Sequence, residues 1–266
     1  MPYDKPVIGI LLSKDDGDII NDVMTEYNKY FDAIYCIDAS SDNSLDIIKS
    51  FDKVKYAVSE KELGINGAML KDGIRQLLLS KVQDDFGYDG WIFPIQTDEM
   101  YVGNIRNILP YADNQNANVI NCLIAHFIMH KTDTETADKP NIVDRKLWYF
   151  MGQCENAAFK NKRGLYYNFF EHMRVLPHEI RPFLVCNRVL IRRHYNQRTE
   201  EQLRARIKNR LDTGWQPAYK ALENNLYITD PNQMITCGAI YSPIQKFDGT
   251  FRFSHEHSGW ISKIIS

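Results

Sequence analysis

A turn rich in acidic and hydroxyl side chains follows the second of several short apolar segments. The segment ends at Asp38, and the turn precedes an expected helix; its residues are Asp38, Ala39, Ser40, Ser41, Asp42, Asn43 and Ser44. A carboxylate at a strand end accepts hydrogen bonds from a ribose or a base N–H, and a helix N-terminus favours phosphate. The alternative is an N-cap and turn without a ligand, because Asp and Ser are common caps.

A second acidic group follows the fourth apolar segment, Trp91–Ile95. Its residues are Gln96, Thr97, Asp98 and Glu99. Carboxylates at a strand end beside a nucleotide pocket hold hard divalent cations that also bind substrate phosphates. A solvated strand end that binds nothing is the alternative for this pair of acids.

Two histidine-containing segments in the second half offer acid–base and ligand chemistry. Glu179 follows His178 in a loop, where a carboxylate serves as a general base. His194 ends an apolar run, where an imidazole serves as a metal ligand. A structural salt bridge, for example from Glu179 to Arg174 or Arg181, and a histidine satisfied by hydrogen bonds are the alternatives.

The first third of the chain alternates short apolar runs with longer amphipathic ones, which predicts βαβ units and a largely parallel sheet. Three strand–helix repeats and a fourth strand predict a Rossmann-like half that ends near residue 110. Ligands of such sheets lie beyond the carboxyl ends of the strands, where Ser13, Asp38 and Asp98 are expected to converge. The expected strands are Val7–Leu12, Ala33–Asp38, Val54–Val58 and Trp91–Ile95, and the expected helices are Ile19–Tyr30, Ser44–Phe51 and Ala68–Lys81.

The second half is less regular and contains more aromatic residues. One continuous domain is favoured over two, with a domain over residues 1–215 and an extension or subdomain over 216–266. Within the domain, residues 1–110 are expected to form one half and residues 111–215 the other. Strands are expected over Val119–Met129, Trp148–Gln153 and Arg181–Arg192, a polar loop over Lys131–Asp144, and a helix over Glu200–Arg210.

The composition is that of an ordinary globular protein, with 44% hydrophobic and 25% charged residues among 266. This excludes collagen-like, disordered and disulfide-scaffold classes. No apolar stretch reaches the roughly 18 to 20 residues that cross a bilayer, and the first residues lack the pattern of a signal peptide. Five widely spaced cysteines without a C-x-x-C pair predict no zinc site and no disulfide framework. We therefore expect a cytoplasmic protein, with the inner face of the membrane as an open alternative.

Charge is distributed unevenly along the chain. The first 100 residues carry 19 acidic and 10 basic side chains, whereas the other 166 carry 15 acidic and 22 basic ones. Between Lys160 and Lys220, 14 basic residues face 5 acidic ones. Such a stretch forms a solvated helix face or meets a diphosphate, an anionic acceptor or a membrane surface, so peripheral membrane contact stays open. A nucleic-acid partner is not expected, because the sequence pI is about 6.4.

Taken in order, these features resemble family 2 glycosyltransferases of the GT-A fold, over roughly residues 5 to 212. The resemblance is to small bacterial members that carry a His-Glu pair followed by a His-Tyr-x-x-Arg-(Ser/Thr)-x-Glu-Gln segment. Here these segments read Pro177-His178-Glu179 and His194-Tyr195-Asn196-Gln197-Arg198-Thr199-Glu200-Glu201-Gln202. The resemblance implies an α/β fold, namely a Rossmann-like three-layer α/β/α domain with a mainly parallel central sheet. It also implies that residues 1–110 are the nucleotide-binding half of this domain and residues 111–215 the acceptor half.

The resemblance also implies an activity. A hexosyltransferase of this kind moves a sugar from a nucleotide-sugar, expected to be UDP-linked, to a hydroxyl of a glycan, lipid-linked or protein acceptor, with inversion at the anomeric carbon. Glu179 is the implied base for the acceptor hydroxyl. The implied nucleotide-binding residues are Ser13, Asp38, Lys71, Asp98 and Arg198.

The implied cofactor is a divalent cation, Mn or Mg, with Asp98 and His194 as its ligands. The D-x-D metal motif of the family reads Gln96-Thr97-Asp98 here, so only its last acid remains. Relatives carry Arg-Asn at the start of the helix after the third strand, where this chain has Leu70-Lys71, so that role falls to Lys71. The alternative function is a nucleotide-sugar-binding protein of the same fold with weakened catalysis.

Overall fold

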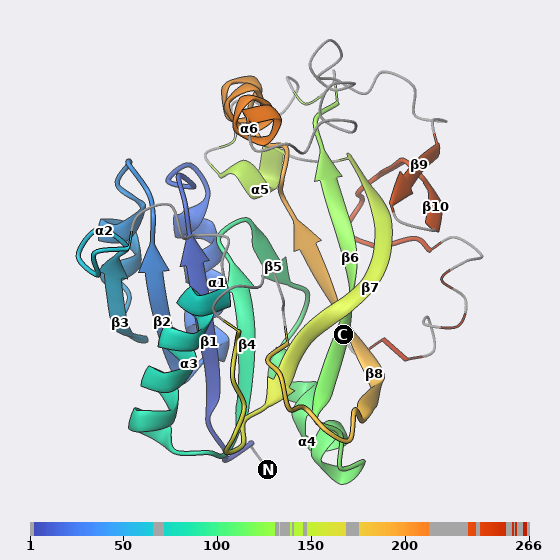
Figure 1. Ribbon diagram of the computed structural model, residues 1–266. Helices are drawn as coiled ribbons and strands as arrows, with labels where there is room; N and C mark the ends of the chain where they lie inside the picture. The colour runs from blue at the N-terminus through green and yellow to red at the C-terminus, as the bar shows by residue number, and fades with distance from the viewer. Residues whose placement is uncertain are drawn as a thin grey trace. The chain divides into compact units, whose positions relative to one another are not determined.

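The computed structural model describes most of the chain, and strands and helices alternate along its first third (Figure 1). Lys71 lies outside the described residues. The described residues are 3–65, 72–130, 133, 139, 141–145, 148–168, 176–212, 234–237, 240–253, 257, 259 and 263–264.

The first seven elements follow the predicted order closely. α3 ends at Phe86 and not at the predicted Lys81, because its apolar face continues through the buried Val82. Gly87 then ends the helix with a φ of 71°, a left-handed conformation that glycine adopts without strain. The elements are β1 (Val7–Ser13), α1 (Ile20–Tyr30), β2 (Ala33–Asp38), α2 (Ser44–Lys49), β3 (Val54–Ser59), α3 (Asp72–Phe86) and β4 (Trp91–Gln96).

The sheet begins with the strand order β3-β2-β1-β4, and these four strands are parallel. The chain adds β2 and β3 on one side of β1 and then crosses to the other side to form β4. The strand order therefore reverses beside β1, which makes the gap between β1 and β4 a topological switch point. The mixed α/β fold with a mainly parallel sheet is confirmed.

Alternate residues of β1 face different layers, which explains its uninterrupted burial. Ile8 and Ile10 pack in one core cluster with Ile74 and Leu78 of α3, and α3 covers this face of the sheet in Figure 1. Gly9 points to the other face, where a Cβ would lie 2.8 Å from Ile95 and 3.5 Å from Phe31 at the end of α1. Helices thus cover both faces of this sheet.

Among the remaining elements, β7 and α5 differ from prediction, β8 begins at Val185 and not at Arg181, and β5, η1 and α4 were not predicted. β7 runs on to Lys160 instead of ending at Gln153, because Gln153–Asn156 is polar and partly exposed, so the apolar signal stops while the strand continues. A short helix, α5, lies within the predicted loop Lys131–Asp144. The remaining elements are β5 (Glu99–Tyr101), the 3-10 helix η1 (Ile105–Ile108), α4 (Leu109–Asn114), β6 (Val119–Ile128), α5 (Ile142–Arg145), β7 (Trp148–Lys160), β8 (Val185–His194), α6 (Glu200–Asp212), β9 (Met234–Cys237), β10 (Ile240–Pro243) and β11 (Gln245–Lys246).

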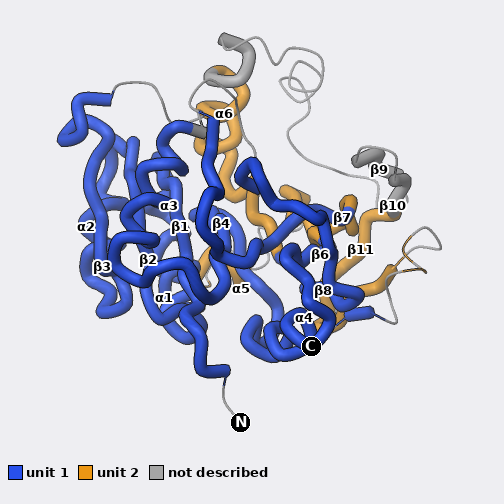
Figure 2. Tube along the Cα trace, turned by 60° about the horizontal axis from the view of Figure 1, so that its bottom comes forward, with its two compact units in different colours: residues 1–123, 154–192, 262–266 blue, residues 124–153, 193–261 orange. Residues whose placement is uncertain are grey.

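Beyond β4 the sheet continues in the order β7-β6-β8-β5, with β11 paired to β7. The chain divides into two compact units, which Figure 2 distinguishes by colour. Unit 1 comprises residues 1–123, 154–192 and 262–266, and unit 2 comprises residues 124–153 and 193–261. The predicted division between residues 215 and 216 stays a prediction, because residues 213–233 lie outside the described part. None of the described helices combines the length and apolar character needed to cross a bilayer.

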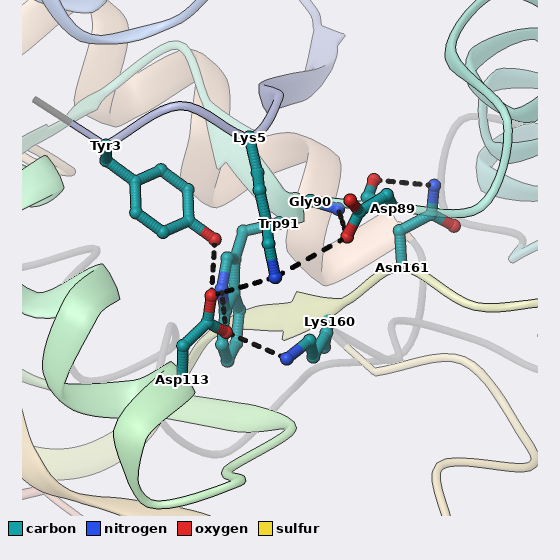
Figure 3. A network of polar contacts seen from close by, with 8 residues as sticks. All are labelled: Tyr3, Lys5, Asp89, Gly90, Trp91, Asp113, Lys160 and Asn161. Atoms are coloured by element: carbon teal, nitrogen blue, oxygen red, sulfur yellow. Dashed lines mark hydrogen bonds and ion pairs between the residues drawn. The ribbon is translucent and has the colours of Figure 1, made fainter.

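A polar network holds the start of the chain near the first residue of β4 (Figure 3). We call the end of the sheet where the parallel strands begin its amino edge. One carboxylate oxygen of Asp113, in α4, accepts from Lys160 Nζ at 2.8 Å. The other accepts from Tyr3 Oη at 3.0 Å and from Lys5 Nζ at 3.2 Å. Partial burial alone raises the pKa of the Asp113 carboxyl, but these hydrogen bonds outweigh burial and hold the pKa below its usual value.

The Asp113 network predicts acid sensitivity. Because the pKa of Asp113 is lower in the folded chain than in the unfolded chain, its stabilisation is present above the unfolded pKa and is lost as the pH falls through the folded value. We expect Asp113→Asn to lower the free energy of unfolding at neutral pH, and the difference from wild type to shrink below about pH 4. Urea denaturation across this pH range measures the difference. Asp46→Asn, at an exposed position of α2, is the control; a constant Asp113 difference at all pH values contradicts the prediction.

Candidate functional site

Polar residues at the carboxyl ends of β1, β2 and β4 form the candidate site. Ser13 and Asp38 are register partners at the ends of β1 and β2, and Leu12 pairs with Gln96 at the end of β4. Asp98 follows Gln96 by two residues, so Ser13, Asp38 and Asp98 all belong to one edge of the sheet, as predicted. The Ser13 hydroxyl is fully buried and has no hydrogen-bond partner in the described structure.

Asp38 is almost fully buried, and its own turn orients it. One carboxylate oxygen accepts from Ser40 Oγ at 2.6 Å, and the other accepts from the Ser40 backbone N–H at 3.1 Å. A carboxylate accepts about four hydrogen bonds in total, so Asp38 retains capacity for further donors. The turn thus holds a negative, oriented acceptor at the end of β2.

The loops after β1 and β2 are joined by hydrogen bonds. The Asp15 N–H donates to Ser40 Oγ at 2.8 Å, and an Asp15 carboxylate oxygen accepts from the Ser41 N–H at 2.7 Å. Asp15 has a φ of 52°, a left-handed conformation that Asp tolerates better than most residues. These contacts keep the two loops together beside the switch point.

Asp42 performs the capping that the sequence suggested for this turn. Its carboxylate accepts from the Ser44 N–H at 2.9 Å and from the Gly17 N–H at 3.0 Å. The N-cap residue of α2, Asn43, makes no side-chain capping bond. Partial burial raises the pKa of the Asp42 carboxyl, but the hydrogen bonds from Ser44 and Gly17 outweigh it and lower the pKa.

The loop after β4 contacts the loop after β1. Thr97 Oγ1 donates to the Asp16 carboxylate, which bridges the switch point. Asp98 is only 6% exposed, so its carboxylate is withheld from bulk water. Sequence reasoning did not single out Asp16, although its place in an acidic turn directly after β1 was the available signal. The acids of these loops give the edge a strongly negative character.

Glu99 has a structural role, unlike the neighbouring Asp98. A carboxylate oxygen of Glu99, in β5, lies 3.0 Å from Arg192 Nη1 in β8, and both side chains are 2% exposed. Arg192 Nη2 lies 3.3 Å from Glu155. Burial alone lowers the pKa of the Arg192 guanidinium, but the surrounding acidic groups outweigh burial and raise the pKa, so the charge is kept. Because an ion pair engages it, Glu99 is not a spare carboxylate for chemistry.

Glu179 is an exposed residue in a left-handed backbone conformation, with a φ of 65°. Such a conformation is uncommon for a residue with a side chain and concentrates at functional sites. The predicted structural alternative, an ion pair from Glu179 to Arg181, is not found among the described residues, and Arg174 lies outside them. The neighbouring His178 stacks on Tyr166, with ring centroids 4.9 Å apart. No described contact joins Glu179 to the carboxyl edge of the sheet.

His194 belongs to a histidine pair in unit 2. Its Nδ1 lies 3.1 Å from Nδ1 of His126, so one of these two nitrogens carries the shared proton. The His126 ring stacks on Phe150 at 4.9 Å, and a Cβ on Gly152 would approach His126 to 2.6 Å. Sequence reasoning missed His126; the available signal was a histidine inside the otherwise apolar strand of residues 119–128.

The remaining predicted site residues are also in unit 2 or undescribed. Arg198 is buried, and its Nη1 donates to the Tyr195 carbonyl at 3.1 Å within the same loop. Lys71 lies outside the described residues. Within the described part of the chain, no group of three or more His, Cys, Asp or Glu side chains gathers as metal ligands.

Comparisons with known proteins gave structural likeness only. No protein-family description and no curated protein matches the sequence. The crystal structure of S. aureus TarS residues 1–349 in complex with UDP-GlcNAc has a TM-score of 0.34 and 13% identity over 47% of this chain. Another crystal structure of S. aureus TarS has a TM-score of 0.35 and 14% identity over 47% of this chain. The matched regions cover 35% and 22% of those two chains, so the likeness spans well under two thirds of either one.

The buried Glu99–Arg192 pair predicts a large stability effect. Arg192→Met leaves the Glu99 carboxylate buried without its partner, so we expect a loss of about 3 to 5 kcal/mol in the free energy of unfolding. Glu99→Gln combined with Arg192→Met removes both charges and should restore part of this loss. Arg204→Met is the control, since it breaks an exposed pair with Glu200 and should change the free energy by about 1 kcal/mol or less. Equal effects of Arg192→Met and Arg204→Met in urea denaturation contradict the assignment.

Proposed function

We propose that the chain is a glycosyltransferase, specifically an inverting hexosyltransferase, which uses a nucleotide-sugar as donor. The observation that carries this proposal is the convergence of Ser13, Asp38 and Asp98 at the switch point of the sheet. Open α/β sheets bind ligands at this position. The His-Glu and His-Tyr-x-x-Arg segments support the choice of glycosyl transfer among the activities of such folds.

The donor is proposed to be a UDP-sugar that lies across the strand ends. Asp38, held by Ser40, offers its remaining lone pairs to hydrogen-bond donors of the nucleoside. The buried hydroxyl of Ser13 provides a further polar group at the same edge. Lys71 and Arg198 are the proposed cationic groups for the nucleotide phosphates.

The acidic character of this edge bears on how a diphosphate binds there. Asp15, Asp16, Asp42 and Asp98 lie in the loops after β1, β2 and β4, and their charges repel a diphosphate at close range. Asp98 would hold a Mn or Mg ion there, and the ion would supply positive charge that offsets this repulsion. Asp98 is the proposed protein ligand on this edge, with His194 as the second ligand implied by the family resemblance.

Glu179 is the proposed base for the acceptor hydroxyl. Its side chain is exposed and forms no ion pair with Arg181 among the described residues, so its lone pairs face solvent or a substrate. Inversion by direct displacement needs a base on the acceptor side, opposite the leaving diphosphate. The acceptor is proposed to be a hydroxyl of a glycan, a lipid-linked saccharide or a protein.

A nucleotide-sugar-binding protein with weakened catalysis is the second candidate, favoured by Gln96 in place of the first acid of the metal motif. Incubation with radiolabelled UDP-sugars distinguishes the two. An enzyme releases UDP slowly by hydrolysis even without an acceptor, whereas a binding protein shows saturable binding without UDP release. Absence of both binding and release overturns the proposal itself.

The role of Glu179 generates a kinetic prediction. Glu179→Gln keeps the shape of the side chain and removes its basicity, so we expect the transfer rate to fall by about 10² to 10⁴-fold. UDP affinity and the melting temperature should stay near wild type, because Glu179 makes no described side-chain contact. Glu201→Gln, at an exposed position of α6, is the control. A Glu179→Gln variant that keeps most of its transfer rate places the base elsewhere.

A further inference from the structure

Three consecutive apolar side chains are exposed at the start of β8. Phe183, Leu184 and Val185 are 56%, 43% and 37% exposed, and Tyr111 of α4 is 48% exposed. Single exposed apolar residues are normal on protein surfaces, but a run of three is unusual unless it has a function. Neither the carboxyl edge of the sheet nor Glu179 accounts for this run.

Hydrogen bonds hold the exposed run in place beside α4. The Asn118 N–H donates to the Leu184 carbonyl at 2.8 Å, and the Leu184 N–H donates to Asn118 Oδ1 at 2.9 Å. Gln115, at the end of α4, exchanges two further hydrogen bonds with Asn187, at 2.6 and 3.0 Å. These hydrogen bonds hold the backbone of Phe183–Val185 in place. Figure 1 shows α4 and the start of β8 side by side.

Basic side chains border the exposed run. Arg188 lies over the Tyr111 ring, with its guanidinium carbon 5.6 Å from the ring centroid. Arg181 is exposed, and its carbonyl accepts from Lys162 Nζ at 3.1 Å. The nearest acid along this segment is Glu179. The carboxylate of Asp113 in α4 is already matched by Lys5 and Lys160.

We propose that this surface is a docking site for an anionic lipid bilayer; we call it the β8 patch and define it as Phe183–Val185 with Tyr111, Arg181 and Arg188. Phe and Leu side chains enter the boundary between headgroups and acyl chains, while Arg and Lys extend to anionic headgroups. The apolar side chains flanked by Arg181 and Arg188 match the acyl chains and anionic headgroups of such a bilayer.

The β8 patch lies away from the carboxyl edge within unit 1. Its neighbour Asn118 accepts from the Lys160 N–H, and Lys160 pairs with Trp91 at the first residue of β4. The patch therefore belongs to the amino edge, whereas Ser13 and Asp38 lie at the opposite ends of their strands. Docking would tether the chain and leave the carboxyl edge uncovered, and the inference is tested by vesicle binding without use of the proposed activity.

Flotation of the full chain with phosphatidylglycerol/phosphatidylcholine vesicles tests the proposal. We expect the wild type to bind anionic vesicles and to bind pure phosphatidylcholine weakly. The double variant Phe183→Ser/Leu184→Ser should lower the partition coefficient by about tenfold or more, and Arg181→Ser by about fivefold. Leu77→Ser, which removes an exposed leucine of α3 outside the patch, should keep wild-type binding.

Circular dichroism confirms that each variant is folded, and Arg181→Ser remains informative if the double variant is unstable. The proposal is overturned if the wild type does not bind anionic vesicles, or if it binds neutral vesicles equally well. It is also overturned if folded patch variants bind like the wild type. Light scattering provides a further test: a wild-type dimer that the double variant converts to a monomer identifies the surface as an interface between copies instead.

Discussion

The pairing of β1 with β2 on one side and with β4 on the other is the constraint on which the candidate site depends. Parallel pairing brings the carboxyl ends of all three strands to one edge, and the reversal of strand order beside β1 puts the switch point between the ends of β1 and β4. The register sets Ser13 opposite Asp38 and places Asp98 two residues beyond the end of β4. A register shift of one residue would turn these side chains to the other face of the sheet.

Charge explains how the acidic groups near this edge differ in role. Glu99 is neutralised in the interior by Arg192 at 3.0 Å, so it stabilises the packing of β5 against β8 and is withdrawn from the site. Asp42 caps α2, while Asp38 and Asp98 stay buried at the edge itself. These charges repel an anionic ligand at the edge, which is the reason for proposing a metal ion there.

The sequence predicted the parallel strands well, because buried parallel strands read as short, continuous apolar runs with clear polar boundaries. β7 was predicted too short, since its polar stretch Gln153–Asn156 interrupts the apolar signal although the strand continues. The shared edge of Ser13, Asp38 and Asp98 followed from βαβ topology alone. In contrast, the Glu99–Arg192 and His126–His194 pairs join positions far apart in the chain, and no spacing rule reports such contacts.

Calorimetric titration with UDP in the presence of manganese tests the central claim, that the carboxyl edge beside β1 binds the nucleotide, most directly. Asp38→Asn removes the charge and keeps the shape that Ser40 holds, and Asp46→Asn changes an exposed acid of the neighbouring helix. The account predicts that Asp38→Asn weakens UDP binding by about 1.5 to 3 kcal/mol, whereas Asp46→Asn leaves it unchanged. Wild-type UDP affinity in a folded Asp38→Asn protein would contradict the account.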